Sequence, residues 1–387
     1  MVTERWLAAT EDAVWVARAH AREVDAEARF PTEAMDALRR TGLLGLLVPV
    51  EHGGLGGGLE DMVQIASRLA GGCLSTALIW SMHCQQVDAV VRHGGPELRD
   101  ELLPRIAEDG HHLASVTTEA GRGGHLLRAQ SPLRQEVGTL RIERDAPVVT
   151  GGMAADGFLI TMRADEDAAA HEVSLVYADR AQVKIEDGRS WSSLGMRGTN
   201  SAGMRISGSV PQRNLVGSRG DFRTVAVDSM IPLAHLGWAA CWLGGARGLF
   251  REMLAAVRSR DWPLDVGSEL VRERLARARM DLELVSSHLQ RVCDEVARIR
   301  ASGGRLDRPA TQIHLNLLKV SAAELTFRAA DRLMQLAGLT RGYLEDSPFP
   351  AERVFRDLRS AQLNNSDDRL LVVTGALVPL DTDVCLS

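Results

Sequence analysis

The stretch RDLRSAQLNNSDDRL, residues 356–370, gathers polar side chains that bear on proton transfer. Asn364 and Asn365 are neutral amides, and an amide at neutral pH cannot accept a proton. Asp367 and Asp368 follow within one helical turn of Asn365, and their carboxylates can accept one. Proton removal at this point of the chain therefore needs a group other than the two amides.

A second stretch, SVTTEAGRGG, places two threonines before a glycine-rich turn. Thr117 and Thr118 end a run that is typical of a strand. A glycine-rich turn exposes backbone N–H groups and lets a planar ring approach the chain closely. The stretch therefore predicts a site for a flat, hydrogen-bonding ligand, with an ordinary strand and turn as the alternative.

The composition limits the classes of partner. A net charge of -6 and a pI near 6.0 exclude nucleic acid as a main partner, because phosphate backbones require a basic surface. The 5 cysteines include no CxxC pair, so we expect free thiols in a reducing compartment and no metal site. The first residues, MVTERWLAATEDAV, lack an apolar run for export or membrane insertion. We expect a cytoplasmic protein without a membrane partner.

Hydrophobic periodicity divides the chain into three parts. Apolar residues recur at three- and four-residue spacing up to about residue 113, and short β-branched runs separated by Gly, Asp and Ser follow to about residue 221. Long amphipathic stretches then return. The predicted fold class is α+β, with an N-terminal helical domain over 1–113, a middle β-barrel-like domain over 114–221 and a C-terminal helical bundle over 222–387.

Several stretches, taken in order, are similar to a known family. FPTEAMDALRRTGLLGLLVPVEHGGLGGG, SVTTEAGRGG, SSLGMRGTNSAGMRISGSVPQRNLVG, and QLAGLTRGY followed by FRDLR each resemble signatures of the acyl-CoA dehydrogenase superfamily. Each match is modest alone. Their order, over nearly the whole length of the chain, identifies the protein as a member of that superfamily.

The resemblance implies non-covalently bound FAD and the residues that hold it. Thr117 and Thr118 match positions that contact the pyrimidine edge of the flavin, and Thr150 matches a flavin-contacting threonine. Val148 stands where the family usually has an aromatic residue, and Gly124 stands where it has a serine for the pyrophosphate. Both departures weaken the expected flavin site without abolishing it.

The resemblance also implies that a neighbouring subunit holds the dinucleotide tail. Arg258 and Trp262 match the family's Arg-x-x-x-aromatic stretch, and Gln335 and Gly338 match its glutamine-containing stretch. For Trp262 the alternative is an aromatic residue that packs at a rim. We therefore expect a homodimer or homotetramer.

The family's proton acceptor is missing from both of its usual positions. The resemblance implies oxidation of an acyl thioester, in which a glutamate removes an α-proton while the flavin takes a β-hydride. Counting from Asp357, that glutamate is replaced by Asn365, and the alternative helix position is Ala234. Arg356 and Asp357 themselves are interpreted as a structural ion pair.

Three interpretations of the missing base stay open. The base has moved to His235 or to Asp367, although a lone histidine is more often a packing residue and an Asp pair more often a solvated helix start. Alternatively, the protein is a flavin-dependent monooxygenase that uses reduced flavin and O₂. Such enzymes tend to carry a histidine near the C-terminal end of this domain, whereas the last histidine of this chain is His314. In the third, flavin and thioester are bound for a non-oxidative step.

We favour the first class: an FAD-dependent oxidoreductase with an altered proton-transfer group. Its substrate would be an acyl thioester carried by coenzyme A or by an acyl carrier protein. The loss of standard catalytic residues favours a specialised biosynthetic pathway.

Overall fold

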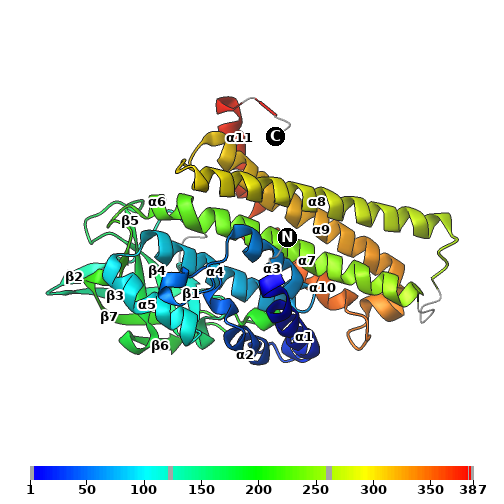
Figure 1. Cartoon of the computed structure of the whole chain (residues 1–387), viewed down its shortest axis with the longest axis horizontal. Helices are drawn as coiled ribbons and strands as arrows, with labels where there is room; N and C mark the ends of the chain where they lie inside the picture. Colours follow the sequence, from blue (N-terminus) through cyan, green and yellow to red (C-terminus); the bar gives the residue numbers. More distant parts are fainter. Residues whose placement is uncertain (1–3, 121–124, 259–263, 382, 385–387) are drawn as a thin grey trace.

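The computed structural model describes residues 4–120, 125–258, 264–381 and 383–384. Helices come first along the chain, two sheets occupy the middle, and long helices complete it (Figure 1). The sheets lie at one end of the molecule, and the long helices extend away from them (Figure 1). The predicted α+β class, with a sheet region between two helical regions, is confirmed.

The N-terminal part is built on a helix that is buried along most of its length. Helix α4 carries an almost unbroken run of buried residues, so it is a core helix and not a surface helix with one apolar face. Pro96, which lacks an N–H, occupies the first turn of the next helix, where that N–H would have no partner. The helices of this part are α1 (Glu4–Ala26), α2 (Thr32–Arg40), α3 (Leu59–Ala70), α4 (Leu74–His93) and α5 (Pro96–Glu108).

The middle part consists of two four-stranded sheets packed face to face. One has the order β1-β4-β5-β8 and the other β2-β3-β7-β6. In the first sheet, β1, β4 and β5 are buried on both faces, because helices α4 and α5 cover one face and the second sheet covers the other. The strands are β1 (Leu113–Val116), β2 (Arg134–Glu136), β3 (Thr139–Ala146), β4 (Gly157–Arg163), β5 (Val173–Asp179), β6 (Val183–Asp187), β7 (Met204–Pro211) and β8 (Leu215–Val216).

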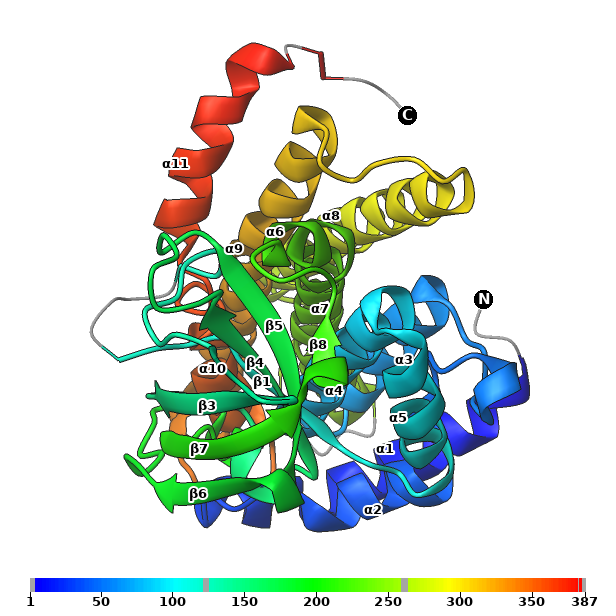
Figure 2. The same ribbon diagram turned by 90° about the vertical axis from the view of Figure 1, so that its left-hand side faces the viewer.

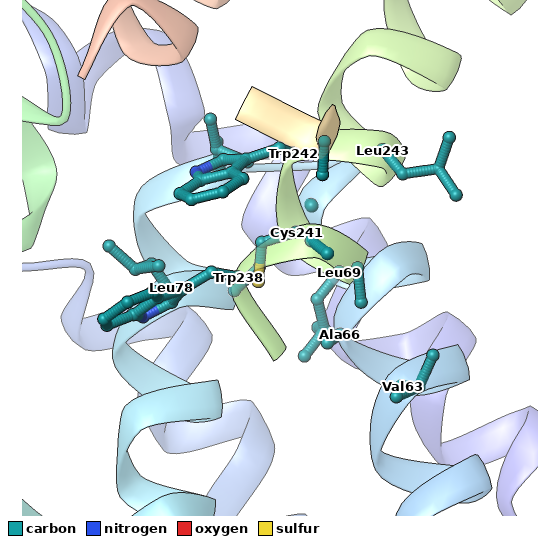
Figure 3. Close-up of a cluster of buried hydrophobic side chains, with 14 of the residues drawn as sticks. Val63, Ala66, Leu69, Leu78, Trp238, Cys241, Trp242 and Leu243 are labelled. Atoms are coloured by element: carbon teal, nitrogen blue, oxygen red, sulfur yellow. The ribbon is translucent and has the colours of Figure 1, made fainter. Parts of the chain in front are cut away.

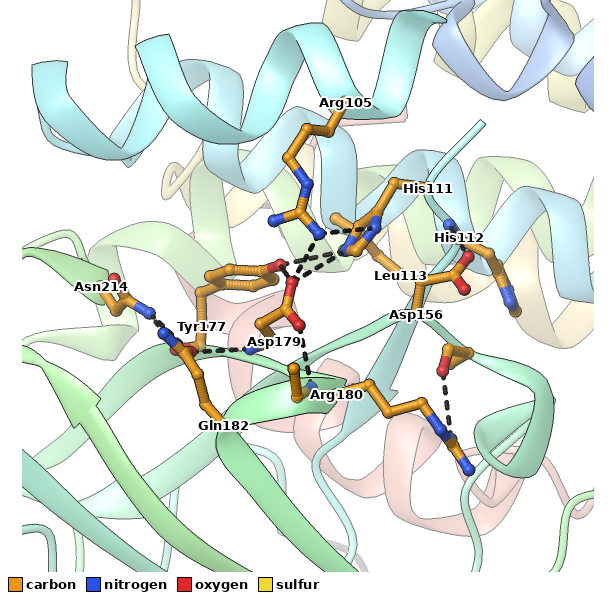
Figure 4. A network of polar contacts seen from close by, with 12 residues as sticks. Arg105, His111, His112, Leu113, Asp156, Tyr177, Asp179, Arg180, Gln182 and Asn214 are labelled. Carbon is orange, nitrogen blue, oxygen red and sulfur yellow. Dashed lines mark hydrogen bonds and ion pairs between the residues drawn. The ribbon is translucent and has the colours of Figure 1, made fainter. Parts of the chain in front are cut away.

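A polar network fastens the N-terminal helices to the first sheet (Figure 4). Arg105 of α5 donates to Asp179 at the end of β5 over 2.7 Å, and the Tyr177 hydroxyl donates to the same carboxylate over 3.1 Å. His111 Nε2 lies 3.0 Å from the Tyr177 hydroxyl, and burial lowers the pKa of His111. The network links α5, the chain entering β1, and β5.

The C-terminal part is a bundle centred on α7. Glycines let this helix approach the N-terminal helices closely: a Cβ at Gly244 would lie 2.1 Å from the backbone oxygen of Ser67 on α3. A Cβ at Gly237 would lie 2.0 Å from Ser81 Oγ on α4. Helix α11 projects from the body of the molecule (Figure 2). The helices are α6 (Phe222–Val225), α7 (Ile231–Arg258), α8 (Glu269–Ala301), α9 (Pro309–Gly338), α10 (Ala351–Arg359) and α11 (Asp367–Leu377).

Candidate flavin and substrate site

The turn after β1 is held by its own side chains. Thr118 Oγ1 donates to the carbonyl oxygen of Val148 over 2.7 Å, and the Val148 N–H donates back over 3.4 Å. Thr117 is half-buried, and its hydroxyl has no hydrogen-bond partner among the described residues. Gly124 lies outside the described residues. The structure therefore brings Thr117, Thr118 and Val148 together at one edge of the sheets.

A buried arginine anchors this turn from beneath. The Arg144 side chain is 0% exposed, lies 2.9 Å from a Glu119 carboxylate oxygen, and donates to the Thr118 carbonyl over 3.1 Å. Burial alone raises the pKa of Glu119, but hydrogen bonds from Ser131 and the charge of Arg144 bring it below its usual value. Glu119 is thus ionised at neutral pH and fixes the start of the glycine-rich turn. The sequence-based interpretation missed this pair.

A chain of hydroxyl groups connects Thr150 to the C-terminal helices. Thr150 Oγ1 lies 3.1 Å from Ser201 Oγ, which lies 2.8 Å from Thr199 Oγ1. Thr199 donates to the Met196 carbonyl over 2.8 Å, and the Met196 N–H donates to Asp357 Oδ1 over 2.5 Å. The candidate flavin edge and α10 are therefore parts of one hydrogen-bonded unit.

Asp357 is buried and has no cation in direct contact among the described residues, which corrects the expected Arg356–Asp357 ion pair. Arg356 instead pairs with Asp25 and Glu352, because adjacent residues on a helix point in different directions. Burial raises the pKa of Asp357 to about 7, and the Met196 N–H only partly offsets that effect. Arg356 and Asp357 thus have different partners, and a structural role for both stays a prediction.

Asn365 lies in the turn between α10 and α11. It is exposed, and its φ of 51° is in the left-handed region, which asparagine tolerates better than most residues. Its backbone N–H has no acceptor among the described residues. The amide side chain cannot accept a proton, whereas the free N–H can still donate to a carbonyl oxygen.

His235 is a core residue of α7. It is 2% exposed, and its Nδ1 lies 3.1 Å from the Leu315 carbonyl oxygen. Burial, followed by the charge of Lys319, lowers the pKa of His235 to about 3. Its ring centroid lies 5.9 Å from that of Trp238. These are features of a neutral packing histidine, and they count against the role of a proton acceptor at neutral pH.

Asp367 forms a buried ion pair at the start of α11. Its Oδ1 lies 2.5 Å from Lys319 Nζ on α9, and the Lys319 side chain is 0% exposed. Lys319 also donates to the Ala361 carbonyl over 2.9 Å and lies 5.5 Å from the Trp242 ring centroid. Burial raises the pKa of Asp367, and the lysine opposes that rise. The pair holds the start of α11 against α9, so the carboxylate is not freely available.

Aromatic side chains of α7 line the core between this helix and α4. Trp238 and Trp242 have ring centroids 6.3 Å apart, and both lie on the side of α7 toward Leu78 of α4 (Figure 3). The indole nitrogen of Trp238 is buried and has no hydrogen-bond partner among the described residues.

Two family models match this chain. Residues 10–109 match the model described as acyl-CoA dehydrogenase, N-terminal domain, and residues 236–365 match acyl-CoA dehydrogenase, C-terminal domain. The two matches together cover more than half of the 387 residues. The chain belongs to the acyl-CoA dehydrogenase family. The resemblance inferred from the sequence is confirmed.

Similar proteins within and around the family differ in reaction. The acryloyl-CoA reductase (NADH) of Anaerotignum propionicum is 24% identical over 354 residues, which cover 89% of this chain and 85% of that protein. FMN-bound dibenzothiophene monooxygenase TdsC from Paenibacillus sp. A11-2 has a TM-score of 0.86 at 21% identity, covering 97% of this chain and 98% of TdsC. The prolyl acyl carrier protein oxidase AnaB has a TM-score of 0.81 at 16% identity, covering 97% and 99%. At these identities the solved structures show a shared fold.

Family membership makes FAD the cofactor of this chain, and the residues present fit a flavin. The hydroxyl groups of Thr117, Thr118 and Thr150 and the nearby backbone supply hydrogen-bonding groups for a ring edge. Val148 is 38% exposed beside them, so an apolar surface is open where a ring would pack. Such a mixed surface suits an aromatic, heteroatom-rich ring.

The expected tail-binding residues lie elsewhere in the chain. Arg258 ends α7, and Gln335 and Gly338 lie near the end of α9, at the end of the bundle away from the sheets (Figure 1). Gln335 is bonded to Asp331 over 2.8 Å, and Gly338 has a φ of 69°. Trp262 lies outside the described residues. One chain does not bring this group to Thr117, so the role in a neighbouring subunit stays a prediction.

None of the helices within the described ranges is long and apolar enough to cross a membrane.

Proposed function

We propose that the protein is an FAD-dependent oxidoreductase of the acyl-CoA dehydrogenase type that acts on an acyl thioester with an altered proton-transfer group. The proposal rests on two features that occur in the same chain. The hydroxyl-bearing edge around Thr118 and Thr150 is intact, and Asn365 presents a free backbone N–H in place of a carboxylate. The thioester carrier is coenzyme A or an acyl carrier protein.

Each group has a distinct part in this proposal. Thr117, Thr118 and Thr150 orient the flavin, which when bound supplies the acceptor for hydride. The Asn365 N–H donates to the thioester carbonyl and stabilises negative charge that develops on its oxygen. Arg144 and Glu119 act through the turn that they fix. We place neither His235 nor Asp367 as the proton acceptor, since the first is buried and neutral and the second is bound to Lys319. The α-proton passes instead to solvent water at the exposed turn that carries Asn365, which makes proton removal slow.

The test uses the flavin absorbance of the purified, FAD-loaded protein under anaerobic conditions. Saturated acyl-CoA thioesters of several chain lengths are added, and bleaching of the oxidised flavin band reports hydride transfer. We expect slow bleaching with wild type and a rate increase of about 10²-fold or more for Asn365→Glu, which supplies a proton acceptor. The increase should follow pH through the pKa of the new carboxyl.

Asn364→Glu is the matched control, because it adds the same charge one residue away. Equal gains from both variants would show an effect of charge alone. No bleaching with any thioester in wild type or in Asn365→Glu would contradict the proposed dehydrogenation.

A second function, a monooxygenase reaction of reduced flavin with O₂, is favoured by a separate observation. The three candidate acceptors are an amide, a buried neutral histidine and an ion-paired aspartate, and oxygenation requires no α-proton acceptor. Its sign would be an oxygen-containing product formed only when an external reductant and air are both supplied. A flavin that stays oxidised while a thioester is consumed would instead support a non-oxidative step.

A further inference from the structure

A groove rich in arginine lies across α3, α7 and α8, apart from the hydroxyl-bearing edge of the sheets. Two adjoining cavities, of about 440 and 250 Å³, share the lining residues Leu243, Arg247, Arg251 and Ser286, and together they make up this groove. Leu243 points away from Trp238 and Trp242 on α7, so the groove and the tryptophan cluster lie on different sides of that helix (Figure 3). We call this the arginine groove; its arginines are Arg68, Arg247, Arg251, Arg258 and Arg279.

Three of these five arginines have no neutralising carboxylate among the residues that the structure describes. Arg279 pairs with Glu283 in the groove, and Arg68 pairs with Glu11 over 2.7 Å. Arg247, Arg251 and Arg258 have no carboxylate partner among the described residues. Such a concentration of positive charge is notable in a chain whose net charge is -6.

Arg247 shows the electrostatic consequence most clearly. It is half-buried, and its one hydrogen bond among the described residues goes to Ser67 Oγ over 2.9 Å. Burial, followed by the nearby charges of Arg251 and Arg68, lowers the pKa of Arg247. A partly desolvated guanidinium beside like charges is unfavourable until an anion joins it. The free protein therefore holds a site whose electrostatics improve when an anion binds.

The rest of the lining is apolar. Leu243, Phe250, Leu254 and Leu282 line the larger cavity beside the arginines. Its volume of about 440 Å³ is within the range of small-molecule sites. Guanidinium groups bind phosphate and carboxylate groups through paired hydrogen bonds, which position as well as attract the ligand.

We propose that the arginine groove binds a small ligand that carries two phosphate or carboxylate groups and an apolar portion. Arg247 and Arg251 hold the anionic groups, and the leucines and Phe250 contact the apolar portion. Arg258 borders the groove and is also a candidate for a neighbouring subunit's FAD tail, so the proposal rests on Arg247 and Arg251. These two residues lie apart from the threonine edge and from Asn365, and the proposal stands whichever reaction the protein performs.

The first experiment is calorimetric titration of the full-length, FAD-loaded protein with inorganic pyrophosphate and, separately, with succinate. We expect saturable binding of at least one probe, weakened about tenfold or more by Arg247→Gln and by Arg251→Gln, since each removes a charge-assisted contact. Arg258 is left intact because it is a candidate for the FAD tail. Binding of pyrophosphate alone would identify a phosphate ligand, and binding of succinate alone a carboxylate ligand.

Arg298→Gln is the matched control, because Arg298 is an exposed arginine of α8 outside both cavities. Its titration should equal that of wild type. The absence of saturable binding by both probes would overturn the proposal, as would binding that Arg247→Gln and Arg251→Gln leave unchanged. Binding lost equally in Arg298→Gln would show non-specific attraction and would overturn it too.

The second experiment measures thermal unfolding at low ionic strength. We expect the bound probe to raise the unfolding midpoint of wild type and to raise that of Arg247→Gln much less. Without a probe, Arg247→Gln should unfold no earlier than wild type, since it removes a charge that lacks a partner. An earlier midpoint for Arg247→Gln would contradict the electrostatic argument and the proposal with it.

Discussion

The edge of the sheets and the turn between α10 and α11 differ in how firmly their candidate site residues are held. At the sheet edge, Thr118 and Thr150 are fixed by bonds to Val148 and Ser201, so the cofactor-facing groups are positioned before any ligand arrives. At the helical turn, Asn365 is exposed and its N–H has no acceptor among the described residues. The hydrogen-bonded unit that joins Thr150 to α10 does not include Asn365, which stands where the family carries its proton acceptor. A chain can lose that acceptor and keep the cofactor-facing groups.

Two buried carboxylates, Asp357 and Asp367, flank that turn, and they differ in the groups that contact them. Asp357 accepts the Met196 N–H and contacts no cation in the part of the chain that the structure describes, and burial raises its pKa to about 7. Asp367 is held by Lys319. Neither is a free base beside Asn365: one is needed to link α10 to Met196, and the other to hold α11.

The largest expected effect comes from breaking the ion pair at α11. Asp367→Ala leaves Lys319 buried without a counter-charge, and we expect the free energy of unfolding to fall by about 3–5 kcal/mol. Urea denaturation followed by circular dichroism measures the change. Asp368→Ala, which removes the neighbouring exposed carboxylate, is the control and should change stability little.

A paired variant sharpens this prediction. Replacing both partners, as Lys319→Met with Asp367→Leu, removes the buried charge and should recover most of the lost stability. A double variant that is as unstable as Asp367→Ala would show that packing, and not the uncompensated charge, is responsible.

The second effect is a dependence of stability on pH through Asp357. The pKa of Asp357 is about 7 in the folded state and 3.8 in the unfolded state. At a pH between these two values the folded state holds the proton and the unfolded state releases it. The resulting stability is full below the unfolded pKa and is lost as pH rises through about 7. Asp357→Asn cannot ionise and keeps an oxygen for the Met196 N–H. The free energy of unfolding of Asp357→Asn minus that of wild type should increase by about 2–3 kcal/mol as the pH is raised from 5 to 7.

Denaturation at several pH values, with wild type and Asp357→Asn measured side by side, isolates this group from other titrating residues. The difference should level off above about pH 8, when the carboxyl is ionised in both states. A difference that stays constant with pH would mean that Asp357 ionises normally in the folded protein.

The third effect concerns the sheet edge. Thr118→Val keeps the shape of the side chain but removes the bond to the Val148 carbonyl. The same hydroxyl is a candidate flavin contact, so we expect FAD affinity to fall about tenfold, roughly the effect of one hydrogen bond lost to the flavin. Equilibrium dialysis with flavin fluorescence measures it. Thr224→Val, which removes an exposed threonine hydroxyl on α6, should leave FAD affinity unchanged.

The sequence predicted the parts of this fold whose signal is local. The long amphipathic stretches became α7, α8 and α9, and the short β-branched runs expected up to about residue 221 became β1, β3, β4, β5 and β7. The short strands β2, β6 and β8 were not foreseen, because two to five residues carry little pattern and exist through pairing with neighbours. The local sequence pattern does not predict a strand that forms only because a neighbouring strand pairs with it.

The candidate site was predicted unevenly for a similar reason. The threonines and the replaced glutamate could be located by resemblance, but the burial of His235 and its bond to Leu315 depend on packing between α7 and α9. The Lys319–Asp367 pair joins residues far apart in the chain. Arg144 did leave a signal: in β3 it occupies an inward position of an alternating strand, where a charge needs a buried partner.

The smallest expected effect tests whether Asn365 is present for its backbone conformation. At a φ of 51°, a residue with an ordinary side chain is strained, so Asn365→Ala should lower the free energy of unfolding by about 1 kcal/mol. Asn365→Gly should differ from wild type by only a few tenths of a kcal/mol, since glycine accepts this conformation but is freer when unfolded. Asn364→Ala is the control, because Asn364 has no positive φ. Equal stability of the Ala and Gly variants would contradict a conformational role, and the amide side chain would then need a contact with substrate or cofactor to account for it. The expected strain is small enough for Asn365→Glu to fold, so that variant can test proton transfer directly.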